Sequence, residues 1–128
     1  MTYQYGVLLR NAKLNAMNTE LGSSATMKIF SGAEPANCAA ADPSGTLVTI
    51  TLPSSPFGTA SAGAIALNGT WSAAASGTGT AASWRIYDSS SNCEIQGNVT
   101  DLTLSPSTSI TSGQTVTITT FSVTAGNS

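Results

Sequence analysis

Chemistry in this chain would have to come mainly from carboxylates, because the sequence contains six Asp and Glu residues and no His. Four of these acids, Asp42, Asp88, Glu94 and Asp101, are of the type that forms general acid/base pairs or Ca²⁺ sites. None of them falls in a recognised ligand loop such as the EF-hand spacing. We therefore predict a non-enzymatic protein with no catalytic residue, no metal site and no cofactor.

The two cysteines, Cys38 and Cys93, are the other reactive side chains. They lie far apart in the sequence, each follows an asparagine, and neither belongs to a CxxC pair. Two interpretations stay open: one disulfide that forms in an oxidising environment, or two buried thiols. The second is favoured, since free Cys is among the most buried residue types.

Aromatic rings offer a binding surface rather than a reaction. Trp71, Trp84 and Tyr87 are candidates for a platform on which sugar rings stack, and Tyr3 and Tyr5 are of the kind enriched at protein interfaces. The more ordinary interpretation places Trp84 in the core and Trp71 partly inside it.

The composition favours assembly over charge-based recognition. Charged residues make up 8% of the chain, against roughly 25% in an average soluble domain. Four Lys and Arg residues are too few to neutralise a phosphate backbone, so we expect no nucleic-acid partner. Neither a membrane span nor a signal peptide is present in the pattern, so we expect no membrane partner and synthesis in the cytoplasm. Because the net charge is only −2, copies repel one another weakly, and we predict a homotrimer.

Residues 7–21 show the periodicity of an amphipathic helix. Val7, Leu14, Met17 and Leu21 recur at spacings of seven, three and four, and Gly22 supplies a left-handed stop. We interpret residues 1–22 as an N-terminal segment that attaches the protein to a partner. Residues 23–128 would then form a single β domain with a core of its own.

After the helix the apolar period changes to two, which is typical of strands. Strands are predicted at residues 27–30 and 48–52, and hairpins at residues 64–73 and 83–99. The first hairpin would turn at Asn68-Gly69, because both residues suit the positive φ of a type I′ turn. The second would turn at residues 89–92.

The last segment changes parity. Val116 and Ile118 share one parity and Phe121 and Val123 the other, which predicts a β-bulge near Thr119-Thr120. Residues 32–45 fit neither period and are predicted to form an ordered loop. The whole pattern indicates a mainly β protein: an antiparallel β-sandwich or jelly-roll-like barrel with one short N-terminal α-helix.

Five stretches are familiar in this order: Leu8-Leu9-Arg10-Asn11-Ala12, Met27-Lys28-Ile29-Phe30-Ser31-Gly32, Pro35-Ala36-Asn37-Cys38-Ala39-Ala40-Ala41-Asp42, Trp84-Arg85-Ile86-Tyr87-Asp88-Ser89, and Ile110-Thr111-Ser112-Gly113-Gln114-Thr115-Val116-Thr117. Over almost the whole chain they resemble a group of small virion proteins of tailed bacteriophages. They are not catalytic motifs, so the resemblance implies membership without a mechanism.

The resemblance implies a structural accessory of the virion, either a head decoration or cement protein or a collar or tail spike subunit. Its partners would be copies of itself and other virion proteins such as the major capsid protein or collar and tail proteins. It would be made in the cytoplasm of the host bacterium and end in the virion. The alternative is a receptor- or carbohydrate-binding module of a phage fibre, in which the loops around Trp71 and Tyr87 contact host polysaccharide.

Overall fold

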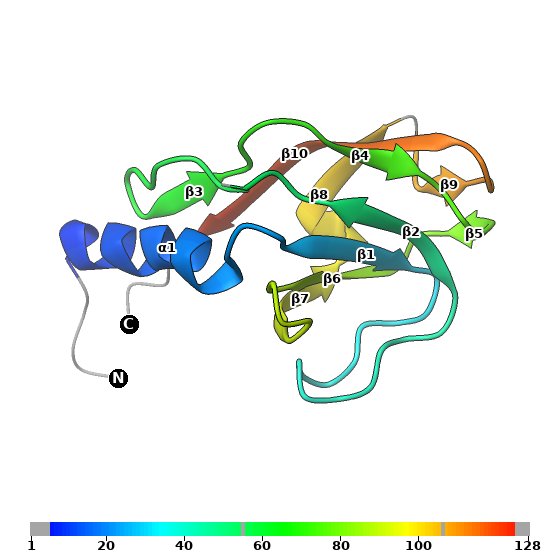
Figure 1. Cartoon of the computed structure of the whole chain (residues 1–128), viewed down its shortest axis with the longest axis horizontal. Helices are drawn as coiled ribbons and strands as arrows, with labels where there is room; N and C mark the ends of the chain where they lie inside the picture. Colours follow the sequence, from blue (N-terminus) through cyan, green and yellow to red (C-terminus); the bar gives the residue numbers. More distant parts are fainter. Residues whose placement is uncertain (1–5, 55, 106, 125–128) are drawn as a thin grey trace.

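The first element among the described residues is a helix that has the predicted bounds. The computed structural model describes residues 6–54, 56–105 and 107–124, and its first element is α1, Val7–Leu21 (Figure 1). Gly22 ends the helix with a φ of 78°, and its N–H donates to the Asn18 carbonyl. A residue with a Cβ rarely adopts this conformation, so the glycine stop is confirmed. Tyr3 and Tyr5 lie outside the described residues.

The first sheet is antiparallel and has four strands in the order β2-β1-β6-β7. These are β1 (Thr26–Phe30), β2 (Thr46–Thr51), β6 (Ser83–Tyr87) and β7 (Cys93–Asn98). The predicted hairpin of β6 and β7 is confirmed. Its turn closes through the Asp88 N–H, which donates to the Asn92 carbonyl.

The second sheet is organised by one long strand, β10 (Thr115–Thr124), which pairs antiparallel with β3, β4 and β8. Its partners are β3 (Ala64–Ala66), β4 (Trp71–Ala74) and β8 (Leu102–Ser105). The short 3₁₀ helix η1 (Val99–Asp101) precedes β8, and β5 (Gly79–Thr80) pairs with β9 (Ser109–Ile110). The two main sheets form the predicted antiparallel β-sandwich.

The hairpin predicted at Asn68-Gly69 is wrong, because β3 and β4 each pair with β10. Gly69 has a φ of 76°, but Asn68 is not among the described residues with positive φ. A type I′ turn needs both. The dipeptide therefore lies between two strands, β3 and β4, that both pair with β10.

The β-bulge near Thr119 is confirmed. Ile118 pairs with Leu104 and Thr120 with Thr103, so the register between β10 and β8 shifts at Thr119. The extra residue returns Phe121 to the buried face that Val116 and Ile118 already occupy.

Aromatic rings fill the space between the sheets. Trp84 of β6 meets Phe121 of β10 edge to face, with ring centroids 4.9 Å apart, and Trp71 and Phe57 complete the cluster. Leu14 and Leu21 of α1 belong to the same core. The helix therefore contributes two buried side chains to this core. Among the described residues, no helix has the length and apolar character to cross a membrane.

Candidate functional site

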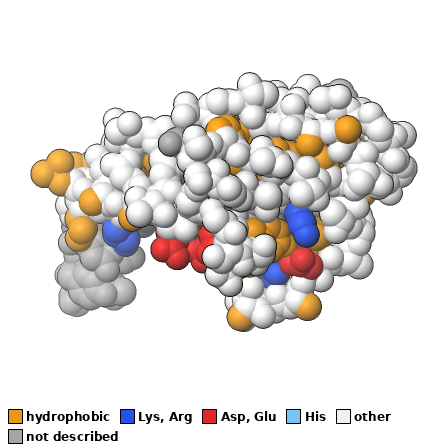
Figure 2. Space-filling view, in the orientation of Figure 1, with side chains coloured by type: hydrophobic (Ala, Val, Ile, Leu, Met, Phe, Trp, Pro, Cys, Tyr) orange, Lys and Arg blue, Asp and Glu red, His pale blue; other side chains and the backbone are white. Residues whose placement is uncertain are grey.

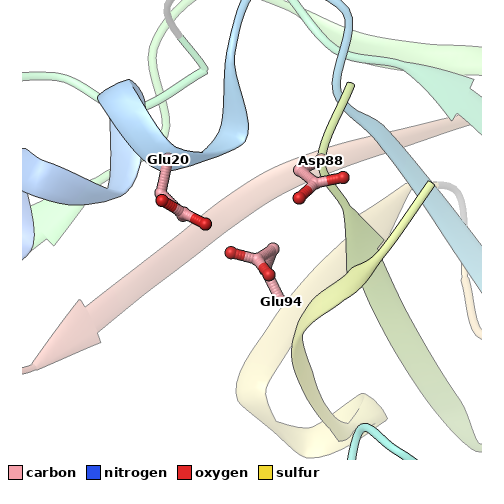
Figure 3. Close-up of side chains that lie close together, drawn as sticks. All are labelled: Glu20, Asp88 and Glu94. Atoms are coloured by element: carbon pink, nitrogen blue, oxygen red, sulfur yellow. The ribbon is translucent and has the colours of Figure 1, made fainter. Parts of the chain in front are cut away.

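Three acidic side chains from different elements point toward one another at the end of the sandwich near α1 (Figure 3). Glu20 comes from the last turn of α1, Asp88 follows β6, and Glu94 lies in β7. One carboxylate oxygen of each lies within 4.8 Å of the others. Asp88 and Glu94 are among the four acids that the sequence indicated as candidates, whereas Glu20 is not. Asp42 lies elsewhere, and the side chain of Asp101 is outside the described part.

The cluster handles its negative charge in two ways. The Asp88 carboxylate accepts hydrogen bonds from the backbone of Asn92 and Ser90 and from the Asn92 side chain, which keeps the pKa of Asp88 below its usual range. Burial raises the pKa of Glu94, and a side-chain hydrogen bond with Glu20 and the charges of Glu20 and Asp88 raise it further. Glu94 therefore keeps its proton to a higher pH than an ordinary glutamate does. The carboxylate oxygens of the cluster are also of the kind that a hard cation such as Ca²⁺ prefers.

A shallow hollow of about 90 Å³ lies beside the two glutamates, lined by Met17, Glu20, Leu21, Glu94 and Ile95. It is several times smaller than the roughly 300 Å³ at which small-molecule sites begin. The hollow admits solvent to the carboxylates rather than a substrate.

A second polar centre lies under the loop of residues 32–45, and it is organised by Arg85. The Arg85 side chain, in the middle of β6, is only 2% exposed. Its guanidinium donates to the Asn37 carbonyl at 3.0 Å, the Ala40 carbonyl at 3.0 Å, the Asp42 carboxylate at 2.9 Å and the Gln96 side chain at 3.2 Å. Each of the donors thus replaces water with a fixed partner, which is the condition for burying a charge.

Asp42 completes this centre together with Tyr87. The Tyr87 hydroxyl donates a hydrogen bond to the Asp42 carboxylate, and this bond, aided by the bond and charge of Arg85, lowers the pKa of Asp42. Burial and the same carboxylate raise the pKa of Tyr87 above its ordinary value. The three side chains fix the loop on the sheet, with Arg85 buried and the Asp42 side chain 43% exposed.

The two cysteines meet at the same place. Cys93 starts β7 opposite Tyr87, and its thiol lies near the side chain of Cys38 in the loop, while the Cys93 S–H donates to the Ile95 carbonyl at 3.8 Å. Both are half-buried free thiols. The sequence left open whether the two cysteines form a disulfide or stay as thiols. In the structure they are neighbouring free thiols.

The aromatic platform is contradicted, because Trp71, Trp84 and Tyr87 are all buried. Trp71 is fully buried, and its indole N–H donates to the Asn68 carbonyl. Tyr87 is buried under the loop through its contact with Asp42. These rings have no face available to stack on a sugar, because they are buried in the interior of the protein.

The four residues of α1 proposed for attachment differ in their exposure. Leu14 and Leu21 are buried and Met17 packs against the core, whereas Val7 is 43% exposed. The two following residues, Leu8 and Leu9, are 82% and 51% exposed. Orange side chains accordingly gather at the end of the molecule where α1 begins (Figure 2).

Three asparagines of α1 carry a function that the sequence interpretation missed. The side-chain oxygens of Asn11, Asn15 and Asn18 accept hydrogen bonds from the backbone N–H groups of Gly63, Ala60 and Phe57. These asparagines bind the helix to a segment that has little regular structure. Their position inside a helix, where Asn has low propensity, was the available signal.

Comparison with known proteins does not assign the chain to a family. No protein-family model, no curated protein and no solved structure matches the chain.

Proposed function

We propose that this protein is a non-enzymatic structural component of a tailed-bacteriophage virion, acting as a head decoration or cement protein or as a collar or tail spike subunit. The proposal rests on the resemblance of its sequence stretches to small virion proteins. Its attachment surface would be the first turn of α1, defined by Val7, Leu8 and Leu9. The observation that carries this part is the exposure of three consecutive large apolar side chains on one turn.

The first turn of α1 suits attachment because it contributes little to the core. Leu14 and Leu21 already hold the helix on the sandwich, so Leu8 and Leu9 are free to pack against another protein. Burial of apolar area contributes roughly 25 cal/mol per Å², so two leucines would add about 2–3 kcal/mol per subunit. Repetition over many copies on a particle would multiply this modest contribution.

The low charge of the molecule supports the same role. Six acidic and four basic residues leave most of the surface uncharged, and white atoms dominate the face in Figure 2. Neighbouring copies on a particle would therefore meet little electrostatic repulsion.

Mass spectrometry of gradient-purified phage particles tests the assignment to the virion. Trypsin should release the peptide of residues 14–28, between Lys13 and Lys28, in an amount comparable to peptides of the other structural proteins. Particles free of this peptide would refute the proposal.

A binding experiment tests the surface. The full-length protein should co-sediment with particles, and Leu8→Ser/Leu9→Ser should lower the bound fraction at least about tenfold, by the loss of apolar burial. The matched control is Ala12→Ser/Ala16→Ser, which adds the same hydroxyls to two exposed positions of α1. Equal binding by both variants would place attachment elsewhere.

A further inference from the structure

The loop of residues 32–45 is held on both sides of Cys38. Before the cysteine, the Gln96 amide donates to the Pro35 carbonyl at 2.7 Å, and Arg85 donates to the Asn37 carbonyl. After it, Arg85 donates to the Ala40 carbonyl and to Asp42. The position of Cys38 over the sheet is thus set by contacts that do not involve its own sulfur.

Cys93 faces the loop for an independent reason. It pairs with Tyr87 across β6 and β7, as Gln96 pairs with Arg85. Residues opposite one another in an antiparallel pair project from the same face of the sheet. Tyr87 and Arg85 both contact the loop, so the Cys93 thiol projects toward the loop as well, where it meets the Cys38 side chain.

We propose that Cys38 and Cys93 form a reversible disulfide that links the loop of residues 32–45 covalently to β7 when the protein enters an oxidising environment. The oxidant would be a small-molecule disulfide such as oxidised glutathione. One cysteine thiolate attacks it, forms a mixed disulfide and releases one reduced glutathione. The second cysteine, having lost its proton, attacks the protein sulfur of the mixed disulfide and releases the second reduced glutathione. The two cysteine sulfurs are oxidised by two electrons and the glutathione disulfide is reduced by two.

The environment of the pair slows its reaction with such an oxidant. Burial, together with the neighbouring Cys38 and the charge of Asp42, raises the pKa of Cys93 to about 12, while Arg85 acts in the opposite direction. The thiolate is the attacking species in exchange. The link should therefore form slowly at neutral pH and faster as the pH rises. This inference does not depend on the proposed virion role.

The test uses the full-length protein, reduced and then incubated with a glutathione redox buffer without denaturant. We expect an intact mass lower by two hydrogens and a peptide joining Cys38 to Cys93. Hydrogen exchange at the amides of residues 36–44 should become about tenfold slower or more, because the bond removes open states of the loop. The melting temperature of the oxidised protein should rise by about 5–10 °C.

Variants test the mechanism of closure. Cys38→Ser and Cys93→Ser should each stop at a mixed disulfide with one glutathione or keep a free thiol. Two free thiols after incubation, a disulfide between two molecules, closure only in denaturant, or unchanged loop exchange after closure would each overturn the inference.

Discussion

At the scale of single residues, Arg85 differs most from what its sequence context indicates. Trp84 and Ile86 alternate with Arg85 and Tyr87, a pattern typical of a strand with one face in solvent. The structure confirms the strand and its two faces but buries both of them. The second face is covered by a loop that binds Arg85 largely through backbone carbonyls. Backbone acceptors leave no pattern in the sequence, so this burial could not have been predicted.

Replacing Arg85 tests how much this centre contributes to stability. Arg85→Met keeps the volume of the side chain but leaves the carbonyls of Asn37 and Ala40 without donors and Asp42 without its ion pair. We expect a loss of about 3 kcal/mol in the free energy of unfolding, measured by urea titration.

The matched control for Arg85 is Lys28→Met on the neighbouring strand. Lys28 is half-buried and lies 5.4 Å from the centre of the Tyr87 ring. Its loss should cost about 1 kcal/mol or less. Equal losses for the two variants would mean that the Arg85 contacts contribute nothing specific.

Glu94 should make stability depend on pH in an unusual direction for a carboxylate. Its pKa is raised in the folded state, so its contribution is fully present below the ordinary pKa of 4.5 and is lost as the pH rises through the folded value. Glu94→Gln removes the negative charge that Glu20 and Asp88 repel. It should raise the melting temperature at pH 7 by about 1–3 °C, because the group is near solvent and screened, and change little at pH 3.

The control for the pH experiment is Glu34→Gln, which neutralises an exposed acid in the loop, away from Glu20 and Asp88. Its effect should be small. If the melting temperature of Glu94→Gln differs from that of the unchanged protein by the same amount at pH 3 and at pH 7, the pKa of Glu94 is not raised in the folded state.

At the scale of elements, α1 provides the hydrogen-bond acceptors that a neighbouring strand would otherwise provide for the backbone of residues 57–63. Asn11, Asn15 and Asn18 are spaced by four and three residues, so their side chains lie along one face of the helix. Their oxygens accept from every third backbone N–H of the segment. Side-chain amides thus satisfy backbone groups that neither sheet reaches.

Removing one of these amides should destabilise the protein despite a gain in helix propensity. Asn15→Ala leaves the Ala60 N–H without its partner, and we expect a loss of about 1 kcal/mol in the free energy of unfolding. Thr19→Ala, at an exposed position of the same helix, should be neutral or slightly stabilising. A stabilised Asn15→Ala protein would show that these bonds carry no net energy.

Two neighbouring predictions show which elements a sequence can reveal. The bulge at Thr119 was predictable because the change of parity lies within one strand, and both halves must reach the same core. The hairpin at Asn68-Gly69 was not, because a turn dipeptide indicates a local break but not which strand each side will pair with. That choice was made by β10, more than 40 residues further along the chain. The meeting of Glu20 with Glu94 was hidden for the same reason.

At the scale of the whole molecule, apolar exposure and low charge together predict self-association. We expect the full-length protein to sediment as a homotrimer at micromolar concentration, since it has little charge to keep single copies apart. Leu8→Ser/Leu9→Ser should shift the distribution toward a 12.9 kDa species if the first turn of α1 forms the contact between copies. A single 12.9 kDa species for the unchanged protein at all concentrations would contradict the prediction.

The pairing of β3, β4 and β8 with β10 also has a consequence for synthesis on the ribosome. None of these three strands has its partner until residues 115–124 have been translated. Trp71 and the apolar residues of β8 therefore stay exposed to solvent until the rest of the chain has left the ribosome. Because the contacts that bury them are distant in sequence, folding should be slow and essentially post-translational. During that interval the nascent protein would be a substrate for chaperones that bind exposed apolar segments.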